Sequence, residues 1–298
     1  LGGSLERAGF EVELEDLAYR LGSGEVEGSD ELASSCAERL LARGEFDVIG
    51  LSTMGATLPV SVAIAEYLRA AAPELRIVLG GPGITGVDEA LLERFPWLDA
   101  CVRGEGEVTV PELLGRWRDG EDLEGVAGVT WRDAEGVVRR EADREQLKDL
   151  GELAPYARHL LPPLSDYKRI TGEADGLTPI DSGRGCAYDC SFCTIGRFWS
   201  RRSRTLPYER LADEVCELKD LEGARNAYLC HDLFGADREH AMAFCEEMIR
   251  RGSPFPWEVR ARLDHLDDEL LEKMSAAGGY RVLFGVESAD AEVLESCD

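Results

Sequence analysis

The stretch LTPIDSGRGCAYDCSFC (177–193) joins a strand pattern to a loop that carries three cysteines. The residues LTPIDS (177–182) predict a short strand. The cysteines follow with the spacing C-x3-C-x2-C: Cys186, Cys190 and Cys193. Gly183 and Gly185 let the backbone pass close to a bound group, because glycine has no side chain in the way. Three thiols so close together indicate a metal centre, yet a closed site needs a fourth ligand that this loop lacks.

A regular series of strands and helices follows the cysteine loop. The further strand patterns are 225–232, 257–264 and 280–288. The helix patterns between and after them are 207–221, 238–252, 267–278 and the beginning of one at 290–297. With the strand at 177–182 these make four βα units, which predict part of a β/α barrel. Loops after the carboxyl ends of barrel strands carry the chemistry, so the cysteine loop is expected on the functional face.

The first part of the chain has the same alternation. Strands are predicted at 10–17, 46–54, 75–81 and 98–106, and helices at 30–44, 59–73 and 108–120. This pattern predicts an open parallel sheet of α/β type. Residues 125–141 predict a β-hairpin with its turn at DAEG (133–136). We therefore expect three parts: an α/β domain over 1–141, a linker with short helices over 142–177, and a partial barrel over 178–298.

The sequence begins and ends within a series of predicted secondary-structure elements. The chain opens on LGGSLERAGFEVELEDL, which reads as a helix running into a strand, without an initiator methionine. Four βα units do not close a barrel, and the last helix pattern has barely begun at Asp298. We expect residues in front of Leu1 and further barrel strands after Asp298.

Charge and cysteine usage restrict the class of protein. With 33 basic and 59 acidic residues, the net charge of −26 argues against general nucleic-acid binding and fits a well-solvated acidic surface. The sequence contains neither a signal peptide nor an apolar run of about 18 residues. The six other cysteines are scattered on strand and helix patterns, so we expect most to be buried, in a reducing cytoplasmic compartment.

The cysteine loop is compatible with three kinds of site. Structural zinc takes four paired Cys or His ligands, and no histidine here has a partnering spacing: His159, His231, His240 and His265. Three unrelated buried cysteines fit poorly in a loop that is polar and rich in glycine. An iron–sulfur cluster fits better, because three thiolates hold three irons of a four-iron cluster and leave one iron open.

The motif C186-AYD-C190-SF-C193, with Phe192 before the last cysteine, resembles the signature of the radical S-adenosylmethionine (SAM) enzymes. The resemblance implies a [4Fe-4S] cluster whose open iron is chelated by SAM. Reductive cleavage of SAM then yields a 5′-deoxyadenosyl radical that abstracts hydrogen from a substrate. It also implies an electron donor of flavodoxin or ferredoxin type.

Three further strand ends carry the resemblance to the SAM site. CHDLF (230–234) places Asp232 there, although a plain loop aspartate or helix cap is the alternative. VRAR (259–262) supplies Arg262 for the SAM carboxylate, and FGVES (284–288) supplies Glu287 and Ser288. The basic stretch RFWSRRSRT (197–205) either faces an anionic group or forms a surface turn.

The first domain resembles the cobalamin-binding domain that accompanies some radical SAM enzymes. It has no G-x-G-x-x-G after a strand, which disfavours a dinucleotide site. LSTM (51–54), LGGP (79–82) and VRGEGE (102–107) follow successive strands, where small residues leave room for a bulky ligand. The cobalamin contacts implied are Ser52, Thr53, Met54, Gly80, Gly81, Gly104, Glu105 and Gly106. The loop that would carry a cobalt-ligating histidine precedes Leu1 in this resemblance.

The leading hypothesis is a cobalamin-dependent radical SAM methyltransferase. It would act on an unactivated carbon of a small-molecule or peptide substrate, with methylcobalamin as methyl donor and a second SAM to regenerate it. The alternative within the same architecture is a cyclisation, rearrangement or oxidation enzyme. A third hypothesis, a corrinoid carrier with a structural metal, predicts zinc in place of iron and no 5′-deoxyadenosine.

Overall fold

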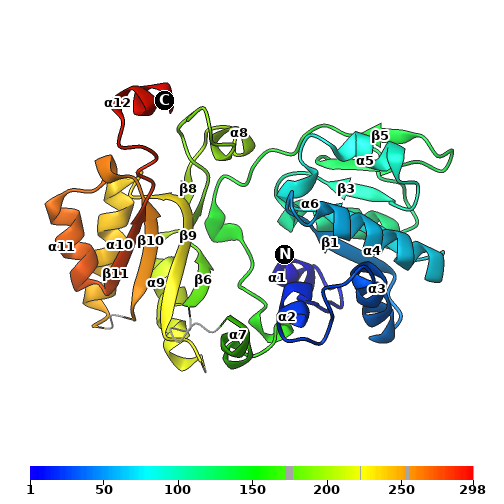
Figure 1. Cartoon of the computed structure of the whole chain (residues 1–298), viewed down its shortest axis with the longest axis horizontal. Coiled ribbons are helices and arrows are strands. Elements are labelled where there is room, and N and C mark those ends of the chain that lie inside the picture. The colour runs from blue at the N-terminus through cyan, green and yellow to red at the C-terminus, as the bar shows by residue number, and fades with distance from the viewer. Residues whose placement is uncertain (172–176, 222, 253–254, 298) are drawn as a thin grey trace. The chain divides into compact units, whose positions relative to one another are not determined.

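The computed structural model describes residues 1–171, 177–221, 223–252 and 255–297. These form two compact units (Figure 1). One comprises Leu1–Leu147 with Leu153–Leu161, and the other comprises Lys148–Glu152 with Pro162–Asp298. Residues 172–176 of the predicted linker, and Asp298, lie outside the described residues. None of the helices in the described ranges is long and apolar enough to span a bilayer.

The first unit is built on a five-stranded mixed sheet in the order β1-β2-β3-β4-β5. Its parallel strands are β1 (Val48–Ser52), β2 (Arg76–Gly80) and β3 (Ala100–Val102). The predicted hairpin is present as β4 (Val129–Arg132) and β5 (Val138–Arg140), and it pairs antiparallel with β3. The predicted α/β sheet is confirmed, and the hairpin extends it at one edge.

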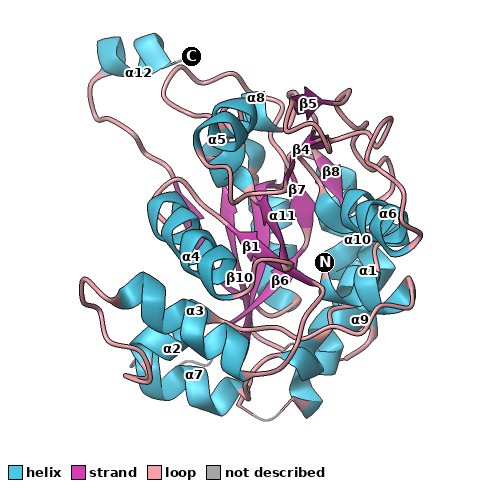
Figure 2. Cartoon of the chain, turned by 90° about the vertical axis from the view of Figure 1, so that its right-hand side faces the viewer, coloured by secondary structure: helices cyan, strands magenta, loops and turns pink. Residues whose placement is uncertain are grey.

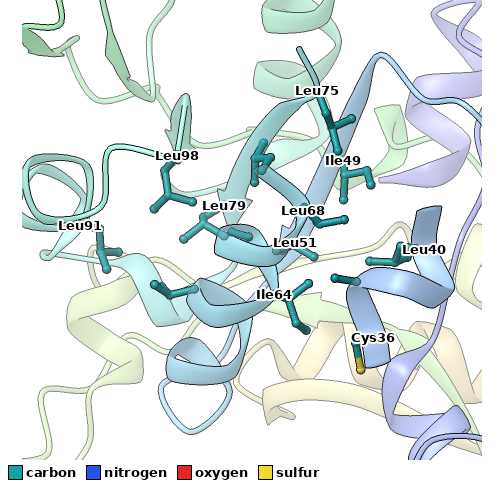
Figure 3. Close-up of a cluster of buried hydrophobic side chains, with 14 of the residues drawn as sticks. Cys36, Leu40, Ile49, Leu51, Ile64, Leu68, Leu75, Leu79, Leu91 and Leu98 are labelled. Atoms are coloured by element: carbon teal, nitrogen blue, oxygen red, sulfur yellow. The ribbon is translucent and has the colours of Figure 1, made fainter. Parts of the chain in front are cut away.

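Helices cover both faces of this sheet, because successive strand residues point to opposite sides. Ile77 and Leu79 of β2 belong to one apolar cluster, while Val78 between them belongs to another. Figure 3 shows the first cluster, which joins the strands to α3, α4 and α5; α3 and α4 also pack side by side (Figure 2). The second cluster lies under α6. The helices are α1 (Gly2–Arg7), α2 (Leu17–Gly22), α3 (Leu32–Ala42), α4 (Leu58–Ala71), α5 (Asp88–Arg94) and α6 (Gly106–Arg118).

The strand predicted at 10–17 is wrong. Residues 10–16 have no regular secondary structure, and α2 begins at Leu17. An alternating segment becomes a strand only when it forms hydrogen bonds with another strand. Among the described residues β1 pairs only with β2, so residues 10–16 do not join the sheet at its β1 edge. Glu15 is instead held by Arg20 (2.6 Å) and Arg39 (2.7 Å), so ion pairs fix this segment against the helices.

Leu68 offers a test of the first core. It is completely buried on α4 within the first apolar cluster. Leu68→Ala is expected to lower the free energy of unfolding by about 2–5 kcal/mol, because it leaves a cavity as well as losing apolar burial. Urea unfolding followed by circular dichroism measures this, with Val60→Ala on the same helix (Val60 is 38% exposed) as the control. Equal losses in the two variants would contradict this packing.

The second unit carries a four-stranded parallel sheet in the order β11-β10-β9-β6. The strands are β6 (Leu177–Asp181), β9 (Asn226–Phe234), β10 (Trp257–Ala261) and β11 (Gly279–Phe284). The helices are α7 (Leu164–Thr171), α8 (Ile195–Phe198), α9 (Tyr208–Glu217), α10 (Arg238–Arg250), α11 (Asp268–Ala276) and α12 (Ala291–Cys297). The four predicted βα units are confirmed, and they form part of a barrel wall.

Among the described residues, helices pack against one side of this sheet, as Figure 1 shows for α10 and α11. Leu229, Trp257 and Val259 are buried on that side, and the Trp257 ring lies 5.5 Å from that of Phe244 on α10. The alternate strand residues face the opposite side and include charged and polar groups. The uncovered face of the sheet therefore carries the residues available for chemistry.

Candidate functional site

The cysteine loop leaves the sheet at the carboxyl end of β6. Its base is closed by a two-residue antiparallel pairing of β7 (Gly183–Arg184) with β8 (Arg204–Thr205). All three cysteines of the loop are free and half-buried: Cys186, Cys190 and Cys193. The loop thus presents three thiols between a strand end and α8.

Glycine is required at two points of this loop. Gly185 has φ +88, and a Cβ there would lie 1.9 Å from the Arg202 backbone oxygen. A Cβ on Gly196 would lie 2.1 Å from the Tyr188 backbone oxygen. Real side chains do not tolerate such distances, so the loop reaches this conformation only with glycine at both positions.

The thiols lie near one another. Burial raises the pKa of the Cys186 thiol, a hydrogen bond from the Tyr188 amide opposes this, and the neighbouring Cys190 and Cys193 raise it further. Three neighbouring thiolates repel one another, and a cationic metal centre displaces the thiol protons and compensates the negative charges.

Within the described ranges, no three His, Cys, Asp or Glu side chains gather around one point as a single metal ion requires. The thiolates of a four-iron cluster bind three different irons and need not converge, so the donor set fits a cluster with one open iron.

Asp232 lies near the end of β9 and contacts the cysteine loop directly. Its Oδ2 accepts a hydrogen bond of 2.8 Å from the Gly185 amide. The carboxylate thus helps to hold the loop at its glycine bend. The SAM contact predicted for Asp232 remains a prediction.

Arg262, at the end of β10, also meets the cysteine loop. Its guanidinium donates two hydrogen bonds of 2.9 Å to the Asp264 carboxylate and lies 4.1 Å from the centre of the Tyr188 ring. The Tyr188 hydroxyl is 2.7 Å from Nε2 of His265. Tyr188 and His265 were not predicted as site residues, although Tyr188 stands between two of the cysteines.

The other residues predicted for SAM are accessible. Phe192 is 55% exposed in the cysteine loop. Glu287 is exposed after β11 and has φ +58, an unusual conformation for a residue with a side chain. The half-buried Ser288 accepts a hydrogen bond from the Asp290 amide at 3.0 Å, just before α12. The structure places these groups on loops that follow β6 and β11.

The basic stretch 197–205 largely turns back on the cysteine loop. Arg201 pairs with Asp189 in that loop, and Arg197 lies 3.8 Å from the same carboxylate. Arg204 stacks 5.2 Å from the Trp199 ring centre. Most of the basic stretch is therefore engaged within the chain.

In the first unit, two predicted cobalamin loops lock together. Thr53 is fully buried, and its amide and hydroxyl both donate to the Gly80 backbone oxygen at 2.8 and 3.0 Å. Gly81 has φ +85, and a Cβ there would lie 2.4 Å from the Thr53 oxygen. Ser52 and Met54 on either side of Thr53 are exposed. Thr53 thus shapes the loop, while its neighbours face outward.

The third predicted cobalamin loop begins α6. Gly104 is exposed with φ +69, and Gly106 opens the helix. The Glu105 carboxylate accepts a hydrogen bond of 2.8 Å from the Leu147 amide, so it anchors a later segment of the same unit. Arg103, which was not predicted, is buried against Asp88 and Thr130 and ties α5 to the hairpin.

Comparison with known proteins accounts for this pairing of units. Residues 1–114 match the model of the B12 binding domain, and residues 180–298 match that of the radical SAM superfamily. The chain therefore contains a B12-binding domain followed by a radical SAM domain. The cysteine loop lies in its radical SAM domain, and the interlocked loops at Thr53 and Gly81 lie in its B12-binding domain.

Relatives carry both methyltransferase and cyclase names. An uncharacterized methyltransferase of Pyrococcus horikoshii is 26% identical over 269 residues, covering 90% of this chain and 57% of the relative. An anaerobic magnesium-protoporphyrin IX monomethyl ester cyclase of Cereibacter sphaeroides is 27% identical, covering 82% of this chain and 40% of the relative. The chain thus spans about half the length of these relatives.

The fold is shared with TsrM, a radical SAM methyltransferase from Kitasatospora setae solved with tryptophan and a SAM analogue bound. The TM-score is 0.78 at 22% identity, covering 98% of this chain and 57% of that one. TsrM has also been solved with cobalamin and a [4Fe-4S] cluster bound. At this identity the likeness shows the common fold of the two proteins.

The other cysteines of this radical SAM protein differ in burial. Cys36, Cys101 and Cys245 are buried, whereas Cys216, Cys230 and Cys297 are half-buried, so burial holds for three of the six and not for most of them. Burial raises the pKa of Cys101 and Cys245 to about 12, and that of Cys230 to about 11. Such thiols stay protonated at neutral pH and are poor metal ligands.

His231 of the radical SAM domain gives a prediction for pH. Its side chain is 6% exposed, 3.3 Å from the Ser203 hydroxyl, and burial lowers its pKa from 6.5 to about 4. The folded protein disfavours the charged imidazole, whereas the unfolded chain binds the proton with the ordinary pKa of 6.5. The free energy of unfolding is therefore at its full value above pH 6.5 and decreases as the pH falls toward 4. Between pH 7 and pH 5 the loss is about 2 kcal/mol.

Urea unfolding of the metal-free wild type and of His231→Gln at both pH values checks this. The variant, which cannot titrate at this position, should show a smaller pH dependence than the wild type. His159→Gln is the control, since His159 is an exposed residue of the other unit. An unchanged pH dependence in His231→Gln would contradict the prediction.

Proposed function

We propose that this chain is part of a cobalamin-dependent radical SAM methyltransferase that acts on an unactivated carbon of a natural-product or peptide substrate. The main support is the three-thiol loop at the carboxyl end of β6, in a chain that also contains a B12-binding domain. Methyltransferases are frequent among its relatives, as in Pyrococcus horikoshii and Kitasatospora setae.

The cysteines have the roles of cluster ligands in this proposal: Cys186, Cys190 and Cys193. When bound, the [4Fe-4S] cluster, SAM and methylcobalamin supply radical generation and the methyl group. The Asp232 carboxylate keeps the loop in place through the Gly185 amide. Electrons would come from a small donor protein of flavodoxin or ferredoxin type.

The remaining predicted residues bind and orient SAM. Phe192 offers an exposed aromatic face, and Arg262 offers a guanidinium for the SAM carboxylate if it leaves Asp264. Glu287 and Ser288 bind the ribose and amino-acid parts. In the B12-binding domain, the exposed Ser52, Met54 and Gly104 are the nearest candidates for cobalamin contacts, with the backbone at Gly80 and Gly81 beside them.

The second candidate is a cyclase or another radical SAM reaction without methyl transfer. The cyclase of Cereibacter sphaeroides, at an identity similar to that of the methyltransferase relative, favours keeping it. Product mass separates the two, since methylation adds one methylene unit and cyclisation does not.

Anaerobic reconstitution with iron, sulfide and cobalamin tests the proposal, on the full-length protein that contains this chain. We expect the absorption of a four-iron cluster, bound corrinoid, and 5′-deoxyadenosine after addition of SAM and a reductant. Zinc in place of iron, or the lack of 5′-deoxyadenosine from a fully loaded protein, would overturn it.

A further inference from the structure

Arg260, the last residue but one of β10, is the basis of a proposal about the substrate. It is exposed on the uncovered face of the second sheet. Across the described ranges its guanidinium forms no ion pair or hydrogen bond, and its one contact is the ring of Tyr228, whose centre is 5.7 Å away. A cation on the functional face thus keeps all its donors available, in a chain with 59 acidic residues.

The register of the sheet places Arg260 beside polar groups of neighbouring strands. Tyr228 lies opposite Glu258, and Arg260 lies opposite Leu283, so these residues share one face. Other charges on this face are already matched. Asp181 accepts two hydrogen bonds from Arg184, at 2.8 and 3.0 Å.

The Glu258 carboxylate is also paired with other groups. Its carboxylate is 3% exposed and accepts hydrogen bonds from the Tyr280 hydroxyl (2.7 Å) and from Arg281 (2.5 Å). Among the described residues, Asp181, Glu258 and Asp232 are each bonded to other groups, and none of them forms an ion pair with Arg260. Within the part of the chain that the structure describes, the Arg260 guanidinium is thus open to a ligand anion.

A strand irregularity leaves Arg260 opposite an unpaired segment of β9. In the pairing of β9 with β10, Val259 lies opposite Leu229 and Ala261 lies opposite Phe234. Arg260 alone therefore faces the irregular segment 230–233, which contains the Asp232 that binds the Gly185 amide. Bulges of this kind often re-aim side chains beside active sites.

We propose that Arg260 binds an anionic group of the substrate, a carboxylate or a phosphate, with the Tyr228 ring beneath it. A guanidinium matches either group with two parallel hydrogen bonds. This inference rests on the proposed function, because it names the substrate class of the same site. It makes the substrate an acid whose charged group lies against the sheet, beside the radical chemistry.

The test uses benzoate, its neutral analogue benzamide, and inorganic phosphate as probes. Each is titrated into the reconstituted protein with SAM present, so that the groups that hold the SAM carboxylate are filled. Saturation-transfer NMR follows the two aromatic probes and their displacement by phosphate. We expect benzoate to bind and benzamide not to bind. Displacement of bound benzoate by inorganic phosphate would identify a site that prefers phosphate.

Variants locate the site. Arg260→Gln should weaken benzoate binding roughly tenfold to a hundredfold, the range for charge-assisted hydrogen bonds. Arg260→Lys, which keeps the charge but not the paired donors, should fall between it and the wild type. The control is Arg250→Gln, since Arg250 is exposed on α10 and pairs with Glu247.

Equal binding of benzoate to the wild type and to Arg260→Gln, equal binding of benzoate and benzamide, or the lack of binding by any probe would overturn the proposal. These titrations do not require turnover. If 5′-deoxyadenosine is not formed, the proposed function fails while the anion site stands or falls on the titrations alone.

Discussion

Cys190→Ala is expected to give a folded protein that retains no four-iron cluster and forms no detectable 5′-deoxyadenosine. Cys190 is half-buried in the loop between β7 and α8, and an alanine there removes one of three thiolates. With two thiolates left, two irons would lack protein ligands, and the cluster cannot be held against loss of iron. Iron and sulfide analysis, visible absorption and chromatography of the SAM products measure the result.

Cys216→Ala is the matched control for that variant. Cys216 is also a half-buried free cysteine of the second unit, but it lies on α9. It should retain full iron content and product formation. A Cys190→Ala protein with wild-type iron content and 5′-deoxyadenosine would remove the three-cysteine cluster from consideration.

Gly185→Ala should have the second largest effect. Its φ of +88 costs a residue with a side chain about 1–2 kcal/mol. The added Cβ would also lie 1.9 Å from the Arg202 backbone oxygen and 2.9 Å from the Trp199 Cβ, so the loop must shift. That shift moves Cys186 and breaks the amide hydrogen bond to Asp232. We expect cluster retention to fall about 10–100-fold, as for the loss of outer-shell support in metal sites.

Gly252→Ala separates conformational strain from the clash. Gly252 has φ +63 at the end of α10, and an added Cβ there meets no atom within 4 Å. It should cost about 1 kcal/mol of stability and leave iron retention unchanged. If Gly185→Ala retained iron as well as Gly252→Ala does, the close approach of the Arg202 backbone would not matter to the cluster.

Local sequence patterns predicted most of the architecture. The apolar runs of β1 and β2 and the helix pattern of α4 lie where the sequence indicates, because burial on both faces demands continuous apolar strands. The sequence also indicates the βα series after the cysteine loop. The short helix α5 was missed, since Asp88–Arg94 is a brief segment that lies between two loops.

Side-chain partners were much harder to predict. Thr53 stands in a loop that resembles a cobalamin contact, yet its hydroxyl bonds the Gly80 oxygen. Tyr188 and His265 are 77 residues apart in sequence, and their hydrogen bond exists only because the end of β10 comes beside the cysteine loop. Arg260 lies two residues before Arg262 and was passed over, since a lone arginine in a strand carries no signal of its own.

The sequence by itself determined most of the order of strands and helices, the two-domain class and the three thiols of the cysteine loop. These features depend on period, composition and close spacing, which are properties of neighbouring residues. Only the tertiary structure decided that 10–16 is not a strand, that Asp232 holds the loop through the Gly185 amide, and that Arg260 has no carboxylate partner among the described residues. Each of these depends on which distant segments supply hydrogen bonds and charges, and only strand pairing and packing bring those segments together.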